Sequence, residues 1–407
     1  MNSEKIMKIF KDTAYVRTGG SSEELRAAEY IKGICAETGL AATIEEFDVN
    51  MADIRKATLT VDGKQIACKG YLCCGSGEVE ADLYYLTDSD KYSLMQCKGK
   101  IVMLDGGLGY WRYRDIIENG ALGFITYTGN ANYSDNDIDQ KELRSYVSKG
   151  EKLLGVSINV KDAIEIINCD SKSAKIEIEQ DEYVGKSRNV ILNIPGEISD
   201  TILLTAHYDS TSLSQGAYDN MSGSIGLLSI AEYFSKNAHR YSLRFVWCGS
   251  EERGLLGAKA YCADHAEELS GIVLNVNLDM IGCIMGKFIA CCTSEKALVD
   301  YIGYMGKECG FQVKPYQGVY SSDSTPFSDN GVPSVSFARS SPSGTATIHN
   351  RYDTLKVMKA EHMQKDIEFI TAFVSRMSNA KLCPVSREIP DNMKERLDEY
   401  LLRKRKD

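Results

Sequence analysis

The chain has 407 residues, of which 43% are hydrophobic, and it carries a formal net charge of −10. This length predicts two or three domains, and the apolar content is ordinary for a soluble globular protein with a sizeable core. The acidic balance argues against nucleic acid as the main partner, and the lack of an apolar run of about 18 residues argues against a membrane span.

Cysteine usage indicates the compartment in which the protein works. The chain has 13 cysteines and no Cys-x-x-Cys pair, and most of the cysteines lie in apolar segments. Adjacent pairs such as Cys73-Cys74 and Cys291-Cys292 suit neither a disulfide framework nor a structural zinc site. We therefore expect reduced core thiols. Since residues 1–11 also lack the apolar core of a signal peptide, we expect a cytoplasmic protein.

The first half of the chain predicts two different regions. Residues 1–48 indicate a helix, a turn, a second helix and a strand. Residues 49–184 contain short strand-like segments between turns with glycine, and we expect only one or two helices there. This region predicts a separate, mostly β domain inserted into the chain. It contains no histidine, because all five histidines follow residue 206.

Strands and helices alternate after residue 185, and this alternation predicts an α/β sheet with helices on both faces. We expect strands at 201–206, 242–248, 272–278, 286–292 and 332–337, and helices near 222–237, 254–265, 294–309 and 357–377. Together with 1–48, residues 185–385 would form one discontinuous domain. Residues 386–407 predict a charged C-terminal extension, either helical or frayed.

An imidazole and two carboxylates come together in the segment 201–223. The apolar residues 201–206 predict a buried strand that delivers His207 and Asp209, and the alternation of strand side chains places both on one face. Asp219 comes just before an apolar helical run. This combination indicates a set of metal ligands rather than a nucleophile triad.

More side chains that can bind metals follow other predicted strands. Glu251 and Glu252 come after strand 242–248, Asp279 comes after strand 272–278, and His349 lies further downstream. Ligands of open α/β sheets gather at the carboxyl ends of the strands, so these side chains can converge. Each residue alone also has an ordinary explanation, such as a buried histidine or a helix N-cap, and only the combination indicates a site.

The number of ligands favours two metal ions over one. Two histidines and three carboxylates exceed what one tetrahedral zinc ion needs, and they suit two ions that share a carboxylate and a bridging water. Asp219 is the expected shared carboxylate. One of the neighbours Glu251 and Glu252 would bind metal while the other takes a proton from the water. Asp209 and Asp353 would orient the two imidazoles by hydrogen bonds.

The sequence resembles the co-catalytic di-zinc exopeptidases, a family that includes bacterial leucyl aminopeptidases and aminopeptidase Y. The resemblance covers roughly 1–48 and 185–380 and implies a mixed, mostly parallel sheet flanked by helices. The motifs that carry it are His207-Tyr-Asp209-Ser, Gly216-Ala-Tyr-Asp219-Asn220-Met-Ser-Gly223, Glu251-Glu252-Arg-Gly254-Leu-Leu-Gly257, Asn277-Leu-Asp279-Met-Ile-Gly282 and His349-Asn-Arg-Tyr-Asp353-Thr354.

This resemblance implies a cofactor of two divalent metal ions, most readily zinc, and a role for each residue of the site. The roles are His207 and Asp279 as ligands of one ion, Glu252 and His349 as ligands of the other, Asp219 as the bridge, and Glu251 as the general base. The insert 49–184 resembles a protease-associated domain in two looser stretches, Lys98–Asp105 and Gly120–Ile125.

The chain departs from the family pattern at two places. It has Ser322-Asp323-Ser324 where the family often has Ser-Asp-His, and Asn350-Arg351 where the family usually has Thr-Pro. Arg351 would either meet a substrate carboxylate or point to solvent. Tyr320 would either stabilise an oxyanion or simply pack in the structure.

The leading hypothesis from the sequence is an aminopeptidase that hydrolyses N-terminal residues of peptides through a metal-bridging water, which Glu251 activates. A carboxypeptidase or amidohydrolase of the same fold is the nearest alternative. A glutaminyl-cyclase-like cyclotransferase and a non-catalytic binding module are less favoured, since no ligand of the set is missing. We expect a peptide substrate and neither a nucleic-acid nor a membrane partner, and a homodimer stays an open alternative.

Overall fold

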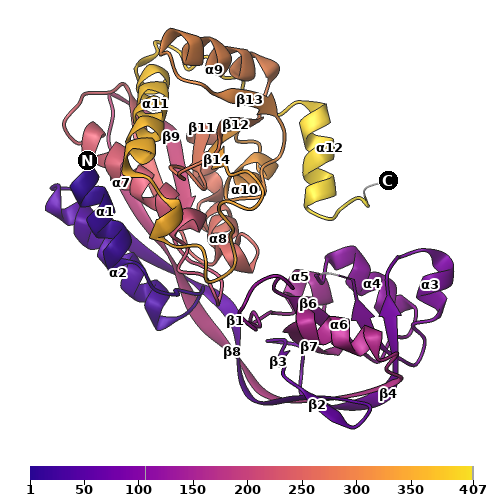
Figure 1. Ribbon diagram of the computed structural model, residues 1–407. Coiled ribbons are helices and arrows are strands. Elements are labelled where there is room, and N and C mark those ends of the chain that lie inside the picture. The colour runs from indigo at the N-terminus through magenta and orange to yellow at the C-terminus, as the bar shows by residue number, and fades with distance from the viewer. Residues whose placement is uncertain (106, 406–407) are drawn as a thin grey trace. The chain divides into compact units, whose positions relative to one another are not determined.

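The chain forms two compact units, Met1–Val49 with Lys186–Asp407 and Asn50–Gly185 (Figure 1). The computed structural model describes residues 1–105 and 107–405, so the last two residues of the expected C-terminal extension lie outside the described part. The strands β1 (Thr43–Val61) and β8 (Ser173–Ile194) contribute residues to both units. Among the described residues, no helix is long and apolar enough to cross a membrane.

The first unit is built on a mostly parallel sheet with the strand order β13-β12-β14-β11-β9-β10-β8, and β1 also pairs with β8. Its further strands are β9 (Ile198–His207), β10 (Tyr241–Cys248), β11 (Ile272–Leu278), β12 (Lys287–Thr293), β13 (Lys314–Gln317) and β14 (Ser334–Ser340). β9 pairs in parallel with both β10 and β11, and β11 pairs in parallel with β14. The predicted fold, a mixed and mostly parallel sheet flanked by helices, is confirmed.

Helices cover both faces of this sheet (Figure 1). Along β9, Ile202, Leu204 and Ala206 enter one apolar core, while Leu203 enters a second core on the opposite face. This alternation is the two-residue period of a strand. The helices on the first core are α1 (Ser3–Asp12), α2 (Ser22–Glu37), α7 (Ser222–Phe234), α9 (Lys296–Glu308) and α11 (Ala360–Asn379), and those on the second are α8 (Leu256–Asp264) and α10 (Ser324–Asp329).

The second unit has its own apolar core and the strand order β8-β4-β5-β6-β7-β3, with β2 paired to β1. Its strands besides β1 and β8 are β2 (Lys64–Ile66), β3 (Lys69–Gly70), β4 (Gly77–Leu86), β5 (Ile101–Leu104), β6 (Gly123–Thr128) and β7 (Leu154–Asn159). The strands from β4 to β7 are parallel neighbours.

The expectation of one or two helices in this second unit is wrong. The structure has four: α3 (Lys91–Met95), α4 (Tyr110–Glu118), α5 (Ser145–Ser148) and α6 (Val160–Asn168). The reason lies in the sheet, because parallel neighbours need crossover connections that are usually helical. α3, α4 and α5 stand in the connections from β4 to β5, β5 to β6 and β6 to β7. Helices of four or five residues are too short to show a helical period in the sequence.

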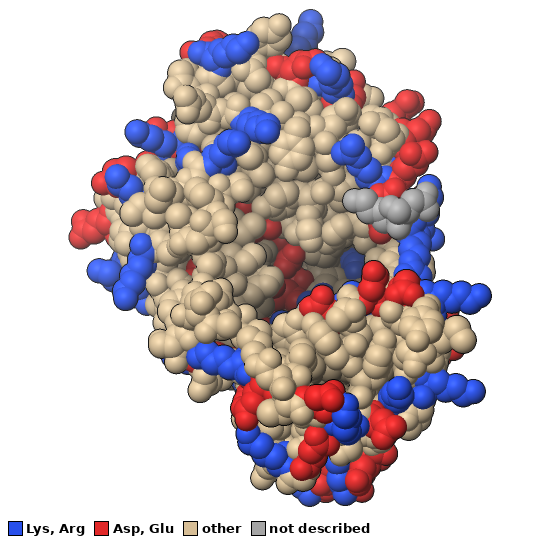
Figure 2. Space-filling view, turned by 45° about the vertical axis from the view of Figure 1, so that its right-hand side comes forward, with Lys and Arg blue, Asp and Glu red and all other residues tan. Residues whose placement is uncertain are grey.

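Charged side chains of both signs are interspersed over the face that Figure 2 shows. Exposed ion pairs occur in each unit, such as Lys56 with Glu177 at 2.6 Å and Arg376 with Glu308 at 2.7 Å. Exposed pairs of this kind contribute little to stability, because water screens the attraction between the charges.

Candidate metal centre

The candidate site lies at the carboxyl ends of β9, β10 and β11. His207 is the last residue of β9 and stands opposite Cys248, the last residue of β10. Glu251 follows β10 by three residues, and Asp279 follows β11 directly. Because these strands are parallel, the residues that follow them emerge at the same edge of the sheet.

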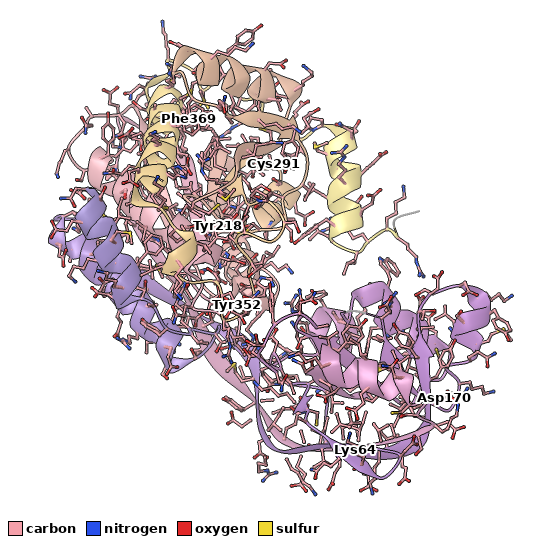
Figure 3. The ribbon with its side chains drawn as sticks, in the orientation of Figure 1. Lys64, Asp170, Tyr218, Cys291, Tyr352 and Phe369 are labelled. Atoms are coloured by element: carbon pink, nitrogen blue, oxygen red, sulfur yellow. The ribbon has the colours of Figure 1, made fainter. Side chains whose placement is uncertain are left out.

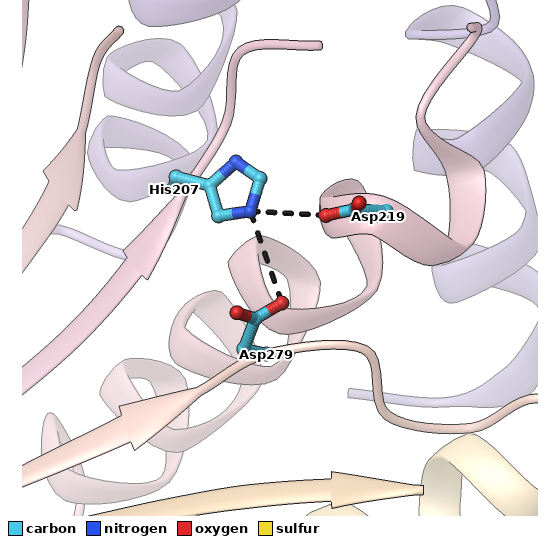
Figure 4. Close-up of side chains that lie close together, drawn as sticks. All are labelled: His207, Asp219 and Asp279. Atoms are coloured by element: carbon cyan, nitrogen blue, oxygen red, sulfur yellow. Dashed lines mark ion pairs between the residues drawn. The ribbon is translucent and has the colours of Figure 1, made fainter. Parts of the chain in front are cut away.

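One group of metal-competent side chains is formed by His207, Asp219 and Asp279 (Figure 4). The imidazole Nε2 of His207 lies 3.1 Å from Asp219 Oδ1 and 3.8 Å from Asp279 Oδ1. All three side chains are buried. Their donor atoms therefore converge on one small volume that solvent barely reaches.

A second group, Asp219, Glu252 and His349, shares one member with the first. His349 Nε2 lies 3.1 Å from Asp219 Oδ2 and 3.1 Å from Glu252 Oε2. Asp219 thus turns one carboxylate oxygen toward each imidazole. Glu251 belongs to neither group, but its Oε2 lies 4.0 Å from His207 Nε2.

Asp209 fixes the pair of glutamates through their backbone. Its two carboxylate oxygens accept hydrogen bonds from the N–H groups of Glu251 at 3.0 Å and Glu252 at 3.2 Å. Asp209 Oδ1 also lies 3.4 Å from Nδ1 of His207. One buried carboxylate therefore holds the backbone of the two glutamates and also lies beside the imidazole of His207.

Asp353 binds the backbone of the turn around Asp219 and not, as expected from the sequence, the imidazole of His349. It accepts hydrogen bonds from the backbone N–H groups of Tyr218 at 2.7 Å and Asp219 at 3.1 Å. Within the described residues, no hydrogen bond joins it to His349. The physical reason is that the turn around Asp219 has backbone N–H groups that need an acceptor, which a buried carboxylate can supply. Asp353 therefore orients the shared carboxylate ligand.

Asn220 links the turn that carries Asp219 to the turn that carries Asp279. Its side-chain N–H donates to Leu278 O at 2.9 Å, and its Oδ1 accepts from Met280 N at 3.0 Å. The backbones approach so closely that a Cβ at Gly223 would lie 2.2 Å from Leu278 O, which explains the glycine. Met221, not Asp219, caps the helix α7, so Asp219 is not used as an N-cap.

Tyr218 adds a second anchor for the same turn (Figure 3). Its hydroxyl donates a hydrogen bond to Arg339 O at 2.6 Å, on strand β14. The guanidinium of Arg339 in turn pairs with Asp366 on α11, which accepts from Gly282 N at 2.9 Å. The turns after β9 and β11 are therefore tied to the sheet and to a covering helix.

Arg17 is a supporting residue that the sequence analysis missed. It is fully buried and donates to five backbone carbonyl groups. These are the carbonyls of Thr13, Tyr15, Tyr208, Gln215 and Gly216. The last three lie 191 to 199 residues from Arg17 in the sequence, at the two ends of the loop between Asp209 and Asp219. An isolated arginine has no periodic signature that predicts such distant partners.

Glu24 supports the glutamate turn from the same N-terminal segment. Its buried carboxylate accepts from Ser250 N at 3.0 Å and from Ser187 Oγ at 2.6 Å. Burial, with a smaller contribution from the charge of Asp209, raises the pKa of Glu24 to about 7. A Cβ at Gly19 would lie 2.1 Å from Ser250 Oγ, so this approach also requires a glycine.

Replacing Arg17 by methionine is expected to lower the free energy of unfolding by about 3 kcal/mol, because several buried carbonyls lose their donor. The loop before Asp219 then loosens, and metal affinity falls as well. Chemical denaturation and metal titration measure the two effects. Arg17→Lys serves as the control, and its smaller loss is expected because lysine keeps the charge but not the planar fork. Equal stability of wild type and Arg17→Met would refute this role.

The excess of carboxylates in the site favours the binding of a cation. Burial lowers the pKa of His349, but its hydrogen bonds to Asp219 and Glu252 outweigh burial and raise the pKa to about 11. For His207, burial again lowers the pKa, while the charge of Glu251 and hydrogen bonds to neighbouring carboxylates raise it well above its ordinary value. Burial raises the pKa of Asp323, another carboxylate beside the site, to about 7. The carboxylates thus outnumber the positive groups.

Tyr320 and Arg351, the two residues that the sequence suggested as substrate contacts, lie in different environments. Burial, followed by the charge of Asp279, raises the pKa of Tyr320 well above its ordinary value, and the charge of Asp219 acts in the same direction. Tyr320 therefore stays protonated near the ligands. Arg351 is exposed on the segment after His349.

Comparisons with known proteins give a matching family and a shared fold. Residues 189–374 match the model of peptidase family M28. The chain is 26% identical to "Aminopeptidase YwaD" of Bacillus subtilis over 389 residues, covering 88% of this chain and 80% of that protein. The zinc aminopeptidase BSAP from Bacillus subtilis has the same fold, with a TM-score of 0.78, 23% identity and coverage of 96% and 99% of the two chains. An aminopeptidase from Aneurinibacillus sp. strain AM-1 gives a TM-score of 0.76, 21% identity and coverage of 95% and 96%.

Proposed function

Because residues 189–374 match the model of peptidase family M28, we propose that the chain is a zinc-dependent aminopeptidase that releases N-terminal residues from peptides. One observation carries this proposal: two histidine–carboxylate groups share the single carboxylate of Asp219. Relatives named as aminopeptidases support the same activity.

The donor set fits two zinc ions. Imidazole nitrogens and carboxylate oxygens are zinc ligands, and His207 with Asp279 would hold one ion while Glu252 with His349 would hold the other. Asp219 would bridge the two ions. Asp279 Oδ1 supports this assignment, because it is buried and has no hydrogen-bond partner among the described residues. When bound, the two ions would polarise the scissile carbonyl and lower the pKa of water.

Glu251 is the proposed general base. Its carboxylate lies beside the ligands without belonging to either group, and Asp209 fixes its backbone. Burial raises the pKa of Glu251 well above its ordinary value, which makes its carboxylate a stronger proton acceptor than an exposed glutamate. Glu251 would take the proton of the attacking water and pass it to the leaving amine.

Other side chains would orient the substrate. Carboxylates beside the ligands that would hold no ion, such as Glu251, would attract a positive group, which suits the free ammonium of a peptide N-terminus. The protonated hydroxyl of Tyr320 is a hydrogen-bond donor beside Asp279 and would stabilise the oxyanion that forms at the carbonyl. Arg351 stays the candidate for the far carboxylate of a short peptide.

A pair of blocked and free substrates tests this proposal. The zinc-loaded protein is expected to hydrolyse an amino-acyl anilide, and N-acetylation of that anilide should abolish the activity because the ammonium is lost. A peptide with an amidated C-terminus serves as the matched control, and its hydrolysis should continue. Retained activity on the acetylated anilide would instead indicate an amidohydrolase, and loss on the amidated peptide alone would indicate a carboxypeptidase.

We also propose that the unit Asn50–Gly185 is a protease-associated domain and that the protein works in the cytoplasm. Lys98–Asp105 and Gly120–Ile125, the two stretches that resemble such a domain, include the strand β5 and the first half of its neighbour β6. All thirteen cysteines are free, which suits a reducing compartment. An experimental structure of this unit with another strand order, or disulfides in protein taken from its cells, would argue against these assignments.

A further inference from the structure

We propose that the C-terminal helix α12 (Asp391–Tyr400) is a positioning element of the active site, which orders the loop Gln317–Ser321 and so fixes the place of Tyr320. The sequence gives little sign of this role, because residues 386–407 predict only a charged extension. The kinetic part of the inference rests on the proposed aminopeptidase function, whereas the structural part does not.

An apolar stripe on α12 contacts this loop. Met393 and Leu397 are buried and stand four residues apart on one face of α12, and Ile389, just before the helix, is buried in the same cluster. These three side chains form a small cluster of their own, and Val319 packs against it. The cluster is separate from the two cores of the first unit, so a change within it need not disturb those cores.

Polar contacts reinforce the same interface. Tyr400 and Ser321 share a hydrogen bond of 2.7 Å between their hydroxyl groups. Arg396 donates to Gln317 O at 3.1 Å. Just after the helix, Arg403 donates to both carboxylate oxygens of Asp329 at 2.6 Å, at the end of α10. The contacts of α12 thus extend from the start of the loop to the helix that follows it.

Tyr320 sits between two residues that contact α12. Val319 packs against the apolar stripe and Ser321 bonds to Tyr400, whereas Tyr320 lies near Asp279 and Asp219. The loop backbone has other anchors at its two ends: Gly318 N donates to Cys292 O at 3.0 Å, and Thr325 Oγ1 donates to Tyr320 O at 2.7 Å. The side chains flanking Tyr320 are therefore held by α12, while the charges of Asp279 and Asp219 act on the Tyr320 hydroxyl.

This arrangement gives α12 a role in catalysis through Tyr320. A hydrogen-bond donor stabilises a developing oxyanion only if it is held within about 0.5 Å of the productive position. Loops between regular elements are otherwise among the most mobile parts of a fold. α12 has ten residues, too few to be stable alone in water, so the helix and the loop must order each other.

The test uses the full-length protein loaded with zinc and the variant Leu397→Asp, which places a charge in the apolar stripe. Hydrogen exchange of the amides in 316–322 is expected to rise about tenfold or more, because the loop then opens locally. The kcat for an amino-acyl anilide should fall about tenfold while bound zinc stays unchanged. Leu397→Met keeps the volume and the apolar character of the side chain, so its hydrogen exchange and kcat should stay near those of the wild type. Glu395→Ala, on the exposed side of α12, should change neither quantity.

Tyr400→Phe provides a milder variant that keeps the apolar stripe and removes only the hydrogen bond to Ser321. It should produce the same changes at smaller size. Unchanged exchange of 316–322 in Leu397→Asp would overturn the inference, as would raised exchange with unchanged kcat. An inactive wild type would instead refute the proposed function, and the exchange measurement would still decide whether α12 orders the loop.

Discussion

The variant Glu251→Gln is expected to bind two zinc ions as the wild type does and to lose about 10³-fold in kcat, within the range that general acid–base catalysis contributes. Glutamine has nearly the same shape as glutamate but does not accept a proton at neutral pH. The contacts that place residue 251 do not depend on its carboxylate, since Asp209 holds the backbone N–H groups of Glu251 and Glu252. The loss should therefore fall on the chemical step.

The comparison with Glu252→Gln sharpens this prediction. Glu252 lies 3.1 Å from His349 Nε2 and is a proposed ligand, so its variant should lose zinc as well as activity. Metal analysis and steady-state kinetics on both variants separate the two roles of these neighbouring side chains. A Glu251→Gln protein with the wild-type rate would show that the base is another group.

The variant Asp219→Ala is expected to lower the bound zinc well below two ions per chain and to abolish measurable turnover. Asp219 is the one residue common to both ligand groups, with its two oxygens 3.1 Å from His207 and from His349. Its removal takes one ligand from each ion. Zinc-dependent stabilisation should shrink too, because a ligand at 1,000 times its Kd stabilises a fold by about 4 kcal/mol.

Metal analysis after dialysis and thermal unfolding with and without zinc measure both effects of Asp219→Ala. Asp300→Asn, an exposed aspartate on α9, is the matched control and should behave as the wild type. Two zinc ions retained by Asp219→Ala would mean that the two groups do not share this carboxylate.

Local patterns predict the sheet of the first unit and the side chains at its edge. Apolar runs ending at His207 and before Asp279 identify β9 and β11, and the parallel order of these strands brings their ends together. The short helices of the second unit escaped prediction because four or five residues give no helical period. The strand β13 lies between the expected elements 294–309 and 332–337, and its four residues are too few to show a strand pattern in the sequence.

The support around the ligands could not be predicted, because it depends on contacts between distant segments. Arg17 meets Gly216, and Glu24 meets Ser250, across about 200 residues of sequence. The composition of residues 386–407 indicates a solvated extension, yet Met393 and Leu397 in this segment are buried. The position of Asp353 after His349 predicted an imidazole partner. In the structure Asp353 instead accepts hydrogen bonds from backbone N–H groups around Asp219, which need an acceptor.

The most direct test of the account is anomalous diffraction at the zinc absorption edge from crystals of the zinc-loaded protein. We expect two zinc ions per chain, one on His207 and Asp279, the other on Glu252 and His349, with a carboxylate oxygen of Asp219 on each. A single ion, or two ions that do not both contact Asp219, would contradict this expectation.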